Sequence, residues 1–420
     1  MTSIHPREAV ASNRDSRPAS APTDVGGNLI AKIDLCRGLF AFLVVAAHSY
    51  DVCWVIHPES IRALPWLLGK FLACTVQSGF YWVMGFFVIS GYCIQLSVGR
   101  QLDSGRFPLG VYFAARLTRI MPLYYAGLFF TLLIELAVAP ARPSFYPDGL
   151  GYVGWLSQVV FAQRFFETFG SFAPSWTITY ELFYYIFFGV LAAFSVRHGV
   201  RPAWVGMGLC ILFGGIMQWL YVNGGKNPFT LHVGLIFGLG TIWFMGALVA
   251  IHGPRLVKRR WVRVLGACWP IVFAGAIGLN ADGRCPMQLI YLVTGAAFTL
   301  MLVRFHAVDE VRAATPRVVP HWFQATAKVV GLASYPTYLF HGPILLLIAT
   351  VISHWRLVSD WRVTWSILVV SGISSGLLLG WLAERPIMAW RAGFLKRLKQ
   401  ASESRAVAAR RPSGLLEISG

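Results

Sequence analysis

Apolar runs long enough to cross a bilayer recur along this chain, and they limit its fold more than any other feature. The first covers residues 33–51, IDLCRGLFAFLVVAAHSYD, and from Gly38 onward its interior is apolar apart from His48 and Ser49. Inside a bilayer such a segment should be helical, because a helix satisfies every backbone polar group internally. Hydrophobic residues make up 56% of the chain and charged residues only 13%, which excludes an ordinary soluble globular protein. The sequence therefore predicts an all-α, polytopic membrane protein.

Ten membrane spans account for the apolar runs. They are expected at residues 33–55, in a segment ending at 98, and at 121–139, 176–196, 203–222, 231–251, 264–279, 287–303, 330–352 and 363–382. The loop 140–174 is aromatic, and its part 152–166 is a candidate for dipping into the membrane.

The two ends of the chain differ from this apolar part. Residues 1–28 are polar and contain no short apolar core, so they are predicted to be a disordered cytoplasmic tail and not a signal peptide. The membrane domain is expected over 29–390. Residues 391–420 are predicted to be a basic cytoplasmic tail.

The formal net charge of +18 has two competing explanations, nucleic-acid binding and membrane orientation. With the ten spans placed as above, 28 of the 36 Lys and Arg residues fall on the side of both termini and 8 on the other. Cytoplasmic loops of membrane proteins carry such an excess, and no basic helix or finger suggests nucleic acid. Both termini are therefore predicted to be cytoplasmic, and no nucleic-acid partner is expected.

Arg37 and His48 are the strongest functional signal. They are eleven residues apart, which in a helix is ~16 Å along the axis and close to three turns, so both side chains project from one face. An ionisable group within the membrane is costly unless it faces a protein interior or a wet cavity, so His48 is a functional hypothesis. Asp51, one turn later, could orient or charge-stabilise the imidazole. The alternative is a topology-setting arginine and a histidine that is merely hydrogen-bonded.

Two further motifs lie near the inner ends of the second and third spans. Arg116 and Arg119, in RLTRIMP, stand one turn apart, and such a pair can grip a phosphate with two guanidinium groups. Alternatively, both could only set topology. In GFFVISG, small residues permit close helix approach, and Ser90 could hydrogen-bond to a neighbour or a ligand.

Three polar sites occur in later spans. In SWTITYELFYY, an unpaired Glu181 would be costly, so a histidine, an arginine or a polar ligand is expected to face it. The alternative is a neutral hydrogen bond between helices. His341, in SYPTYLFHGP, is a second intramembrane histidine, and alone it is more often structural than chemical. Glu384 and Arg385 are expected to form a cytoplasmic ion pair at the end of the last span.

A metal site is a weak alternative. His48, Asp51, Glu181 and His341 could converge, but none has the spacing of an HExxH motif. The seven cysteines are scattered without a CxxC pair, so neither a disulfide framework nor a metal site is expected.

Six segments, taken in order, resemble the acyltransferase-3 family of bacterial membrane acyltransferases. They are IDLCRGLFAFLVVAAH, GFFVISGYCI, RLTRIMPLYY, SWTITYELFYY, SYPTYLFHGP and ERP. The Arg-x10-His motif of the family corresponds to Arg37 and His48, and its RxxR motif to Arg116 and Arg119. Its FFxxSG motif corresponds to residues 86–91.

The resemblance implies ten spans in the bacterial inner membrane and transfer of an acyl group, often acetyl, from cytoplasmic acyl-CoA to a sugar hydroxyl outside. The expected partners are acyl-CoA, a saccharide or glycolipid acceptor, membrane lipid and, as further candidates, polysaccharide-synthesis or export proteins. No metal is expected. Some members add an SGNH hydrolase-like domain after the last span, and here the membrane domain is expected to act alone or with a separate partner. Many members carry WSLSVEEQFY in the fourth span, with two adjacent acids. This chain has a single acid there, Glu181, so only Glu181 is carried over from that motif.

Two sets of residues follow from the motifs and the resemblance together. The donor is expected to be bound by Arg37, Arg116, Arg119, Ser90 and His341. Catalysis is assigned to His48 as general base, with Asp51 or Glu181 stabilising the imidazolium.

Direct transfer is favoured over a covalent acyl-histidine, and both mechanisms stay open. Either one predicts a single continuous passage, ringed by cations, from the cytosol to His48. A transporter of lipid-linked sugars or small anions is the main rival, because histidines and acids within the membrane could couple to protons. A non-enzymatic scaffold in polysaccharide export is a third class.

Overall fold

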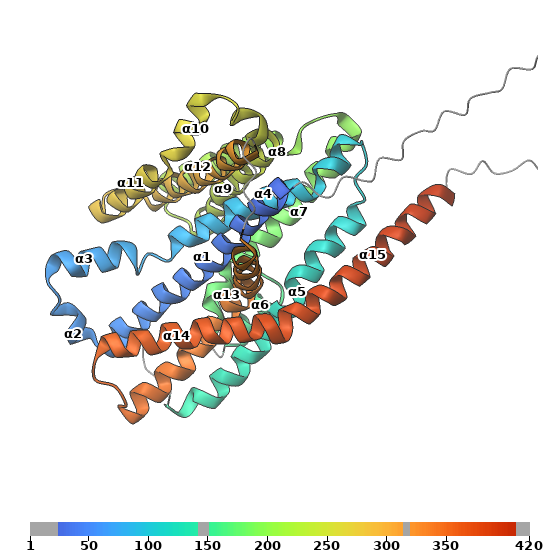
Figure 1. The fold of residues 1–420 in the computed structure, drawn as a ribbon. Helices are drawn as coiled ribbons and strands as arrows, with labels where there is room; N and C mark the ends of the chain where they lie inside the picture. The colour runs from blue at the N-terminus through green and yellow to red at the C-terminus, as the bar shows by residue number, and fades with distance from the viewer. Residues whose placement is uncertain (1–23, 142–150, 314–319, 409–420) are drawn as a thin grey trace, which may run out of the picture.

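The structure, a computed structural model, describes residues 24–141, 151–313 and 320–408. Within these ranges the chain forms helices joined by short connections and no strand, which confirms the all-α prediction (Figure 1). The helices are α1 (Asp24–Ile56), α2 (Pro58–Arg62), α3 (Trp66–Thr75), α4 (Phe80–Asp103), α5 (Leu109–Val138), α6 (Tyr152–Val159), α7 (Trp176–His198), α8 (Pro202–Asn223), α9 (Pro228–Leu256), α10 (Arg260–Ala267), α11 (Trp269–Asp282), α12 (Met287–Ala313), α13 (His321–Trp355), α14 (Trp361–Leu379) and α15 (Arg385–Ala408), with the helical turns η1 (Ala139–Ala141), η2 (Gly170–Ser175) and η3 (Gly380–Glu384).

Eight helical segments of the described chain are long and apolar enough to cross a membrane. The pair α10 and α11, bent by 40° at its break, would make a ninth span if it is counted as one. The eight segments and this pair correspond to nine of the ten expected spans. The remaining expected span, at residues 33–55, lies in α1. This helix has 33 residues but is not among these segments. The protein is therefore multi-pass, while the count of ten and the side of the termini stay predictions.

Figure 1 shows α8 to α12 gathered on one side of the bundle and α14 and α15 on the other, with α1, α4 and α13 between them. The most extensive packing joins α1 to α13, α4 to α9 and α8 to α9. The central helices α1, α4 and α13 carry three of the six motifs that the sequence singled out.

Glycines let α4 and α9 approach closely. A Cβ atom added to Gly91 would collide with the carbonyl oxygen of Trp243, and one added to Gly246 would collide with the carbonyl oxygen of Val88. Each helix thus presents a glycine to the backbone of the other, as small-residue contacts within membranes do. The small residues of GFFVISG therefore serve helix packing, and this packing brings Trp243 beside Ser90.

The connection before α7 reaches into the bundle. The Tyr124 hydroxyl, in the middle of α5, donates to the carbonyl oxygen of Gln158 at 2.9 Å, and the Tyr338 hydroxyl, in the middle of α13, donates to that of Pro174 at 2.6 Å. These contacts place Gln158 and Pro174 within the bundle, while the expectation that residues 152–166 dip into the membrane stays a prediction. Residues 142–150 of that loop lie outside the described residues.

Near both ends of the chain, helices include residues that the sequence assigned to tails. The expected N-terminal tail lies outside the described residues up to residue 23, and α1 begins at Asp24. At the other end α15 runs without a break from Arg385 to Ala408, so the expected tail boundary at 391 falls inside a helix. Residues 409–420 lie outside the described part.

Candidate active site

A small cavity of about 240 Å³ opens among α1, α4, α5, α7, α13 and α15. The charged residues that line it are Arg37, Arg116, Arg119, Arg391 and Glu181. Four cations face one carboxylate, so the cavity has a surplus of positive charge and is suited to an anion. We call it the cation cavity. It brings together the three arginines that the sequence assigned to donor binding, a role that stays a prediction.

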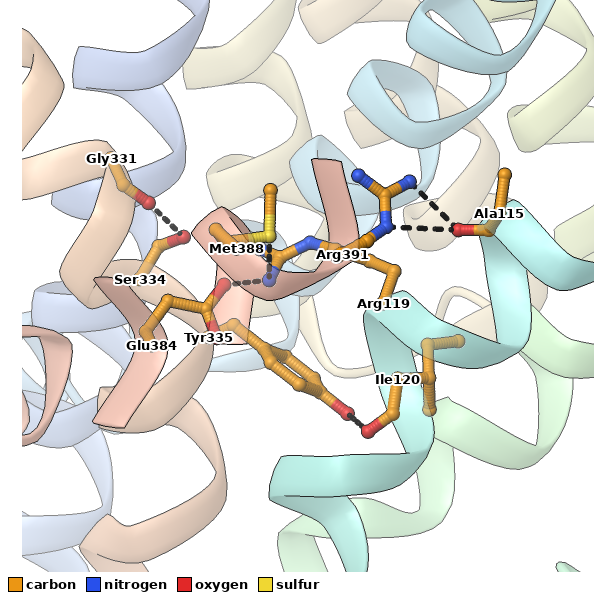
Figure 2. A network of polar contacts seen from close by, with 9 residues as sticks. All are labelled: Ala115, Arg119, Ile120, Gly331, Ser334, Tyr335, Glu384, Met388 and Arg391. Atoms are coloured by element: carbon orange, nitrogen blue, oxygen red, sulfur yellow. Dashed lines mark hydrogen bonds and ion pairs between the residues drawn. The ribbon is translucent and has the colours of Figure 1, made fainter. Parts of the chain in front are cut away.

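Arg119 is held by partners on three sides, as Figure 2 shows. It forms an ion pair with Glu384, whose side chain is only 1% exposed, and its Nη1 lies 3.7 Å from the sulfur of Met388. Its guanidinium also sits 5.1 Å from the ring centroid of Tyr335. The expected pairing of Glu384 with Arg385 is therefore wrong. Glu384 turns to Arg119 because the carboxylate is buried at the junction of η3 with α15, and a buried charge needs a partner inside the protein.

Arg116 has neutral partners. Its Nη2 donates to the Ser97 hydroxyl at 2.9 Å, and its guanidinium lies 5.6 Å from the ring centroid of Tyr112 and 5.9 Å from that of Tyr185. These contacts orient the side chain without cancelling its charge. Its positive charge therefore remains available to a ligand.

Glu181 takes its hydrogen bonds from two hydroxyls. The Ser90 hydroxyl donates to its Oε1 at 3.0 Å, and the Tyr185 hydroxyl donates to the same oxygen. The indole of Trp243 in turn donates to Ser90 at 3.2 Å. Glu181 and Ser90 both line the cation cavity, so Glu181 lies with the arginines and not, as the catalytic assignment had it, beside His48.

A second cavity, of about 860 Å³, contains the histidines. His48 and Asp51 line it, with Nδ1 of His48 3.6 Å from Oδ2 of Asp51 and both side chains 42% exposed. Its wall also contains Gln163, Arg164, Phe166, Glu167, Trp176 and His232. We call it the histidine cavity. The Asp51 contact leaves Nε2 of His48 for other partners.

His341 lies against His48 and not with the arginines. The two imidazole rings stack with centroids 5.2 Å apart and an interplanar angle of 27°. Nδ1 of His341 is 3.1 Å from the carbonyl oxygen of Thr337, and because a carbonyl can only accept, this nitrogen carries the proton. Nε2 is then a lone-pair acceptor, buried and without a hydrogen-bond partner in the described part of the chain. The assignment of His341 to donor binding therefore does not match its place.

A thin wall separates the two cavities. Tyr338 lines the cation cavity, and its ring centroid lies 5.9 Å from that of His341, which lines the histidine cavity. The Tyr338 hydroxyl lies 2.7 Å from that of Thr177 on the cation side and 2.6 Å from the carbonyl oxygen of Pro174 on the histidine side. In place of the single passage that we expected, the described residues form two cavities, with no lining residue in common, on either side of the contact between Tyr338 and His341.

The four residues of the metal alternative are divided between these cavities. Glu181 lies in one, and His48, Asp51 and His341 lie in the other. In the part of the chain that the structure describes, no three His, Cys, Asp or Glu side chains are grouped closely enough to hold a metal ion.

The family model for the acyltransferase domain of the acyltransferase-3 family matches residues 30–385. The chain belongs to the acyltransferase-3 family. It is therefore a membrane acyltransferase, as the sequence predicted. No curated protein and no solved structure matches it.

Sequence reasoning missed several residues around the cavities of this acyltransferase. Trp243 lies in no motif, and Tyr338 lies within SYPTYLFHGP but was given no role; only packing between distant helices shows where the two side chains lie. Arg391 was assigned to a tail. A signal for it existed, since Glu384, Met388 and Arg391 follow one another at spacings of four and three residues, which puts them on one face of a helix.

Proposed function

We propose that this acyltransferase moves an acyl group, which we expect to be acetyl, from cytoplasmic acyl-CoA to a hydroxyl of a cell-surface or exported saccharide. The observation that carries the proposal is the pair of cavities on either side of the contact between Tyr338 and His341, one rich in cations and the other containing His48. Such an arrangement suits two substrates that arrive from opposite sides of a membrane.

The cation cavity suits the donor. Acyl-CoA carries its negative charges on the phosphates of its nucleotide and its thioester at the end of a long, thin arm. The volume of about 240 Å³ is below the roughly 300 to 1,000 Å³ of sites that enclose a whole drug-sized ligand. We therefore propose that the arm enters while the phosphates stay at the mouth with the arginines.

The histidine cavity suits the acceptor. With Nδ1 of His48 turned to Asp51, Nε2 can take the proton of an acceptor hydroxyl. The hydroxyl oxygen bonds to the thioester carbonyl carbon, the carbon–sulfur bond breaks, and the leaving sulfur takes the proton from the imidazolium. Asp51 stabilises that imidazolium. A covalent acyl-histidine at His48 would use the same geometry and is distinguished by trapping the acylated enzyme without acceptor.

The wall at Tyr338 must open for transfer. The Tyr338 hydroxyl is held by two hydrogen bonds, to Thr177 and Pro174, and a change of its rotamer would join the cavities. In this proposal Glu181, held by Ser90 and Tyr185, acts on the donor side and leaves Asp51 as the partner of His48.

The test compares His48→Ala with a matched control. The protein is reconstituted in proteoliposomes with labelled acetyl-CoA and extracted surface glycans, and label on the glycan is measured. Loss of a general base should lower transfer by about 10² to 10⁴, whereas His354→Ala, at an exposed histidine, should leave it unchanged. Normal transfer by folded His48→Ala protein would remove His48 from the chemistry. Glycans that stay unlabelled with the wild type would favour the transporter.

The acceptor is identified by a second measurement. Mass spectrometry of surface glycans from cells with and without the protein reads the acyl mass and its position together. A glycan that loses the same acyl group in cells carrying His48→Ala is the acceptor.

A further inference from the structure

Arg391 contributes a cation to the donor side from beyond the stretch that the family model matches. That stretch ends at residue 385, whereas Arg391 lies two turns into α15. It nevertheless lines the cation cavity with Arg37, Arg116 and Arg119, and its side chain is half-buried. The RxxR and Arg-x10-His motifs therefore do not account for all the positive charge in this cavity.

The guanidinium of Arg391 is fixed by a neutral acceptor. Its Nε and Nη2 both donate to the carbonyl oxygen of Ala115, at 3.3 and 2.8 Å, as Figure 2 shows. These two bonds hold the group in place but bring no negative charge. A guanidinium has five N–H donors, so three remain for another acceptor. Among the described residues no carboxylate lies within ion-pair distance of Arg391.

Arg119 differs in this respect. The carboxylate of Glu384 offsets its charge, and Met388 and Tyr335 surround it. A phosphate would have to compete with Glu384 for this arginine. The sequence predicted that Arg116 and Arg119 bind a phosphate together, but Arg119 is already paired with Glu384 inside the protein.

Arg391 and Arg116 form a second pair of arginines in the cation cavity. Ala115 immediately precedes Arg116 in α5, so the carbonyl that holds Arg391 belongs to the neighbouring residue. The two guanidinium groups come from different helices, α5 and α15, and line the same cavity. Paired guanidinium groups bind phosphate through several charge-assisted hydrogen bonds.

We propose that Arg391 binds a phosphate group of the acyl donor together with Arg116. This inference rests on the proposed function in one respect, namely that the donor is acyl-CoA. It assigns a donor contact to the C-terminal helix.

The experiment measures donor kinetics for Arg391→Gln and for the control Arg397→Gln. Arg397 is an exposed arginine on the same helix that does not line the cavity. We expect Arg391→Gln to raise KM for acetyl-CoA about tenfold or more, the loss of one charge-assisted hydrogen bond, with kcat and acceptor KM within about twofold. Arg397→Gln should behave as the wild type. An unchanged donor KM in a folded Arg391→Gln protein would overturn the inference.

Acetyl-dephospho-CoA, which lacks the 3′-phosphate, locates the contact. If Arg391 binds the 3′-phosphate, the variant and the wild type should have equal KM for this donor. If it binds the diphosphate, the tenfold difference should persist. Either result supports the contact and assigns its phosphate.

A measurement on the wild type covers the case in which Arg391→Gln does not fold. Phenylglyoxal modifies accessible arginines, and peptide mass spectrometry reads each site. Saturating CoA should protect Arg391 at least threefold while Arg397 reacts as before. Equal modification of Arg391 with and without bound CoA would overturn the inference and leave the proposed function intact. A wild type that binds no CoA would overturn the donor assignment and this inference with it.

Discussion

Arg119 and Glu384 show how one side chain can belong to both the site and the fold. Arg119 lines the cation cavity, and its ion pair with Glu384 joins α5 to the last transmembrane segment. Both side chains are largely buried, at 18% and 1% exposure, so neither charge is well solvated. Removing one partner leaves the other charge buried and uncompensated.

We therefore expect Arg119→Met to destabilise the protein more than Arg116→Met does. Breaking a buried pair costs about 3 to 5 kcal/mol, and replacing both partners by apolar residues restores much of the loss. The Tm of the purified protein should fall for Arg119→Met and recover in the double variant Arg119→Met with Glu384→Met. Arg116→Met should keep its Tm and raise donor KM, since the partners of Arg116, the Ser97 hydroxyl and two tyrosine rings, are neutral. An Arg119→Met protein that melts as the wild type would contradict the structural role of the pair.

At the scale of helices, the contact between α4 and α9 positions the side chains around Ser90. Ser90 and Gly91 are adjacent, so the close approach at Gly91 fixes the distance between Ser90 and Trp243. Ser90 then donates to Glu181 on α7. Three helices are thus joined through one short motif.

Gly91→Ala should weaken this contact, because its Cβ would meet the carbonyl of Trp243. Overpacking of this kind costs about 1 to 3 kcal/mol, and we expect a lower Tm together with reduced transfer. Gly99→Ala, in the same helix, is the control: its Cβ would meet nothing closer than Gln95 at 3.9 Å. It should be neutral or slightly stabilising, since alanine is the better helix former. Equal melting of the two variants would show that the approach at Gly91 is not limiting.

At the scale of the whole molecule, the two cavities lie at different depths along α1. Arg37 lines one and His48 the other, and their separation along the helix is ~16 Å. The excess of positive charge on the side of the termini predicts that the Arg37 end faces the cytoplasm. Donor and acceptor should then enter from opposite faces.

This arrangement predicts one-sided use of the donor. In vesicles of known orientation, acetyl-CoA, which does not cross membranes, should support transfer only when it is added on the side that exposes the C-terminus. Protease removal of a C-terminal tag reports that side independently. Transfer that requires acetyl-CoA on the opposite side would reverse the predicted topology.

Much of this protein could be read from local patterns. Hydropathy over about 20 residues predicts a membrane helix because the backbone has no other way to satisfy its polar groups in lipid. Helical spacing put Arg37 and His48 on one face, and six short motifs in order indicated the acyltransferase-3 family, which the family model confirms. Each of these inferences depends only on residues that are close in sequence.

Only the tertiary structure decided which polar groups meet. His341 stacks on His48, Glu181 faces the arginines, Glu384 pairs with Arg119, and one expected passage is two cavities. Such pairings depend on the rotation of each helix about its axis and on its neighbours. Packing between segments far apart in the chain determines the rotation of each helix and its neighbours. Hydropathy is nearly uniform around a buried membrane helix, so it predicts neither of them.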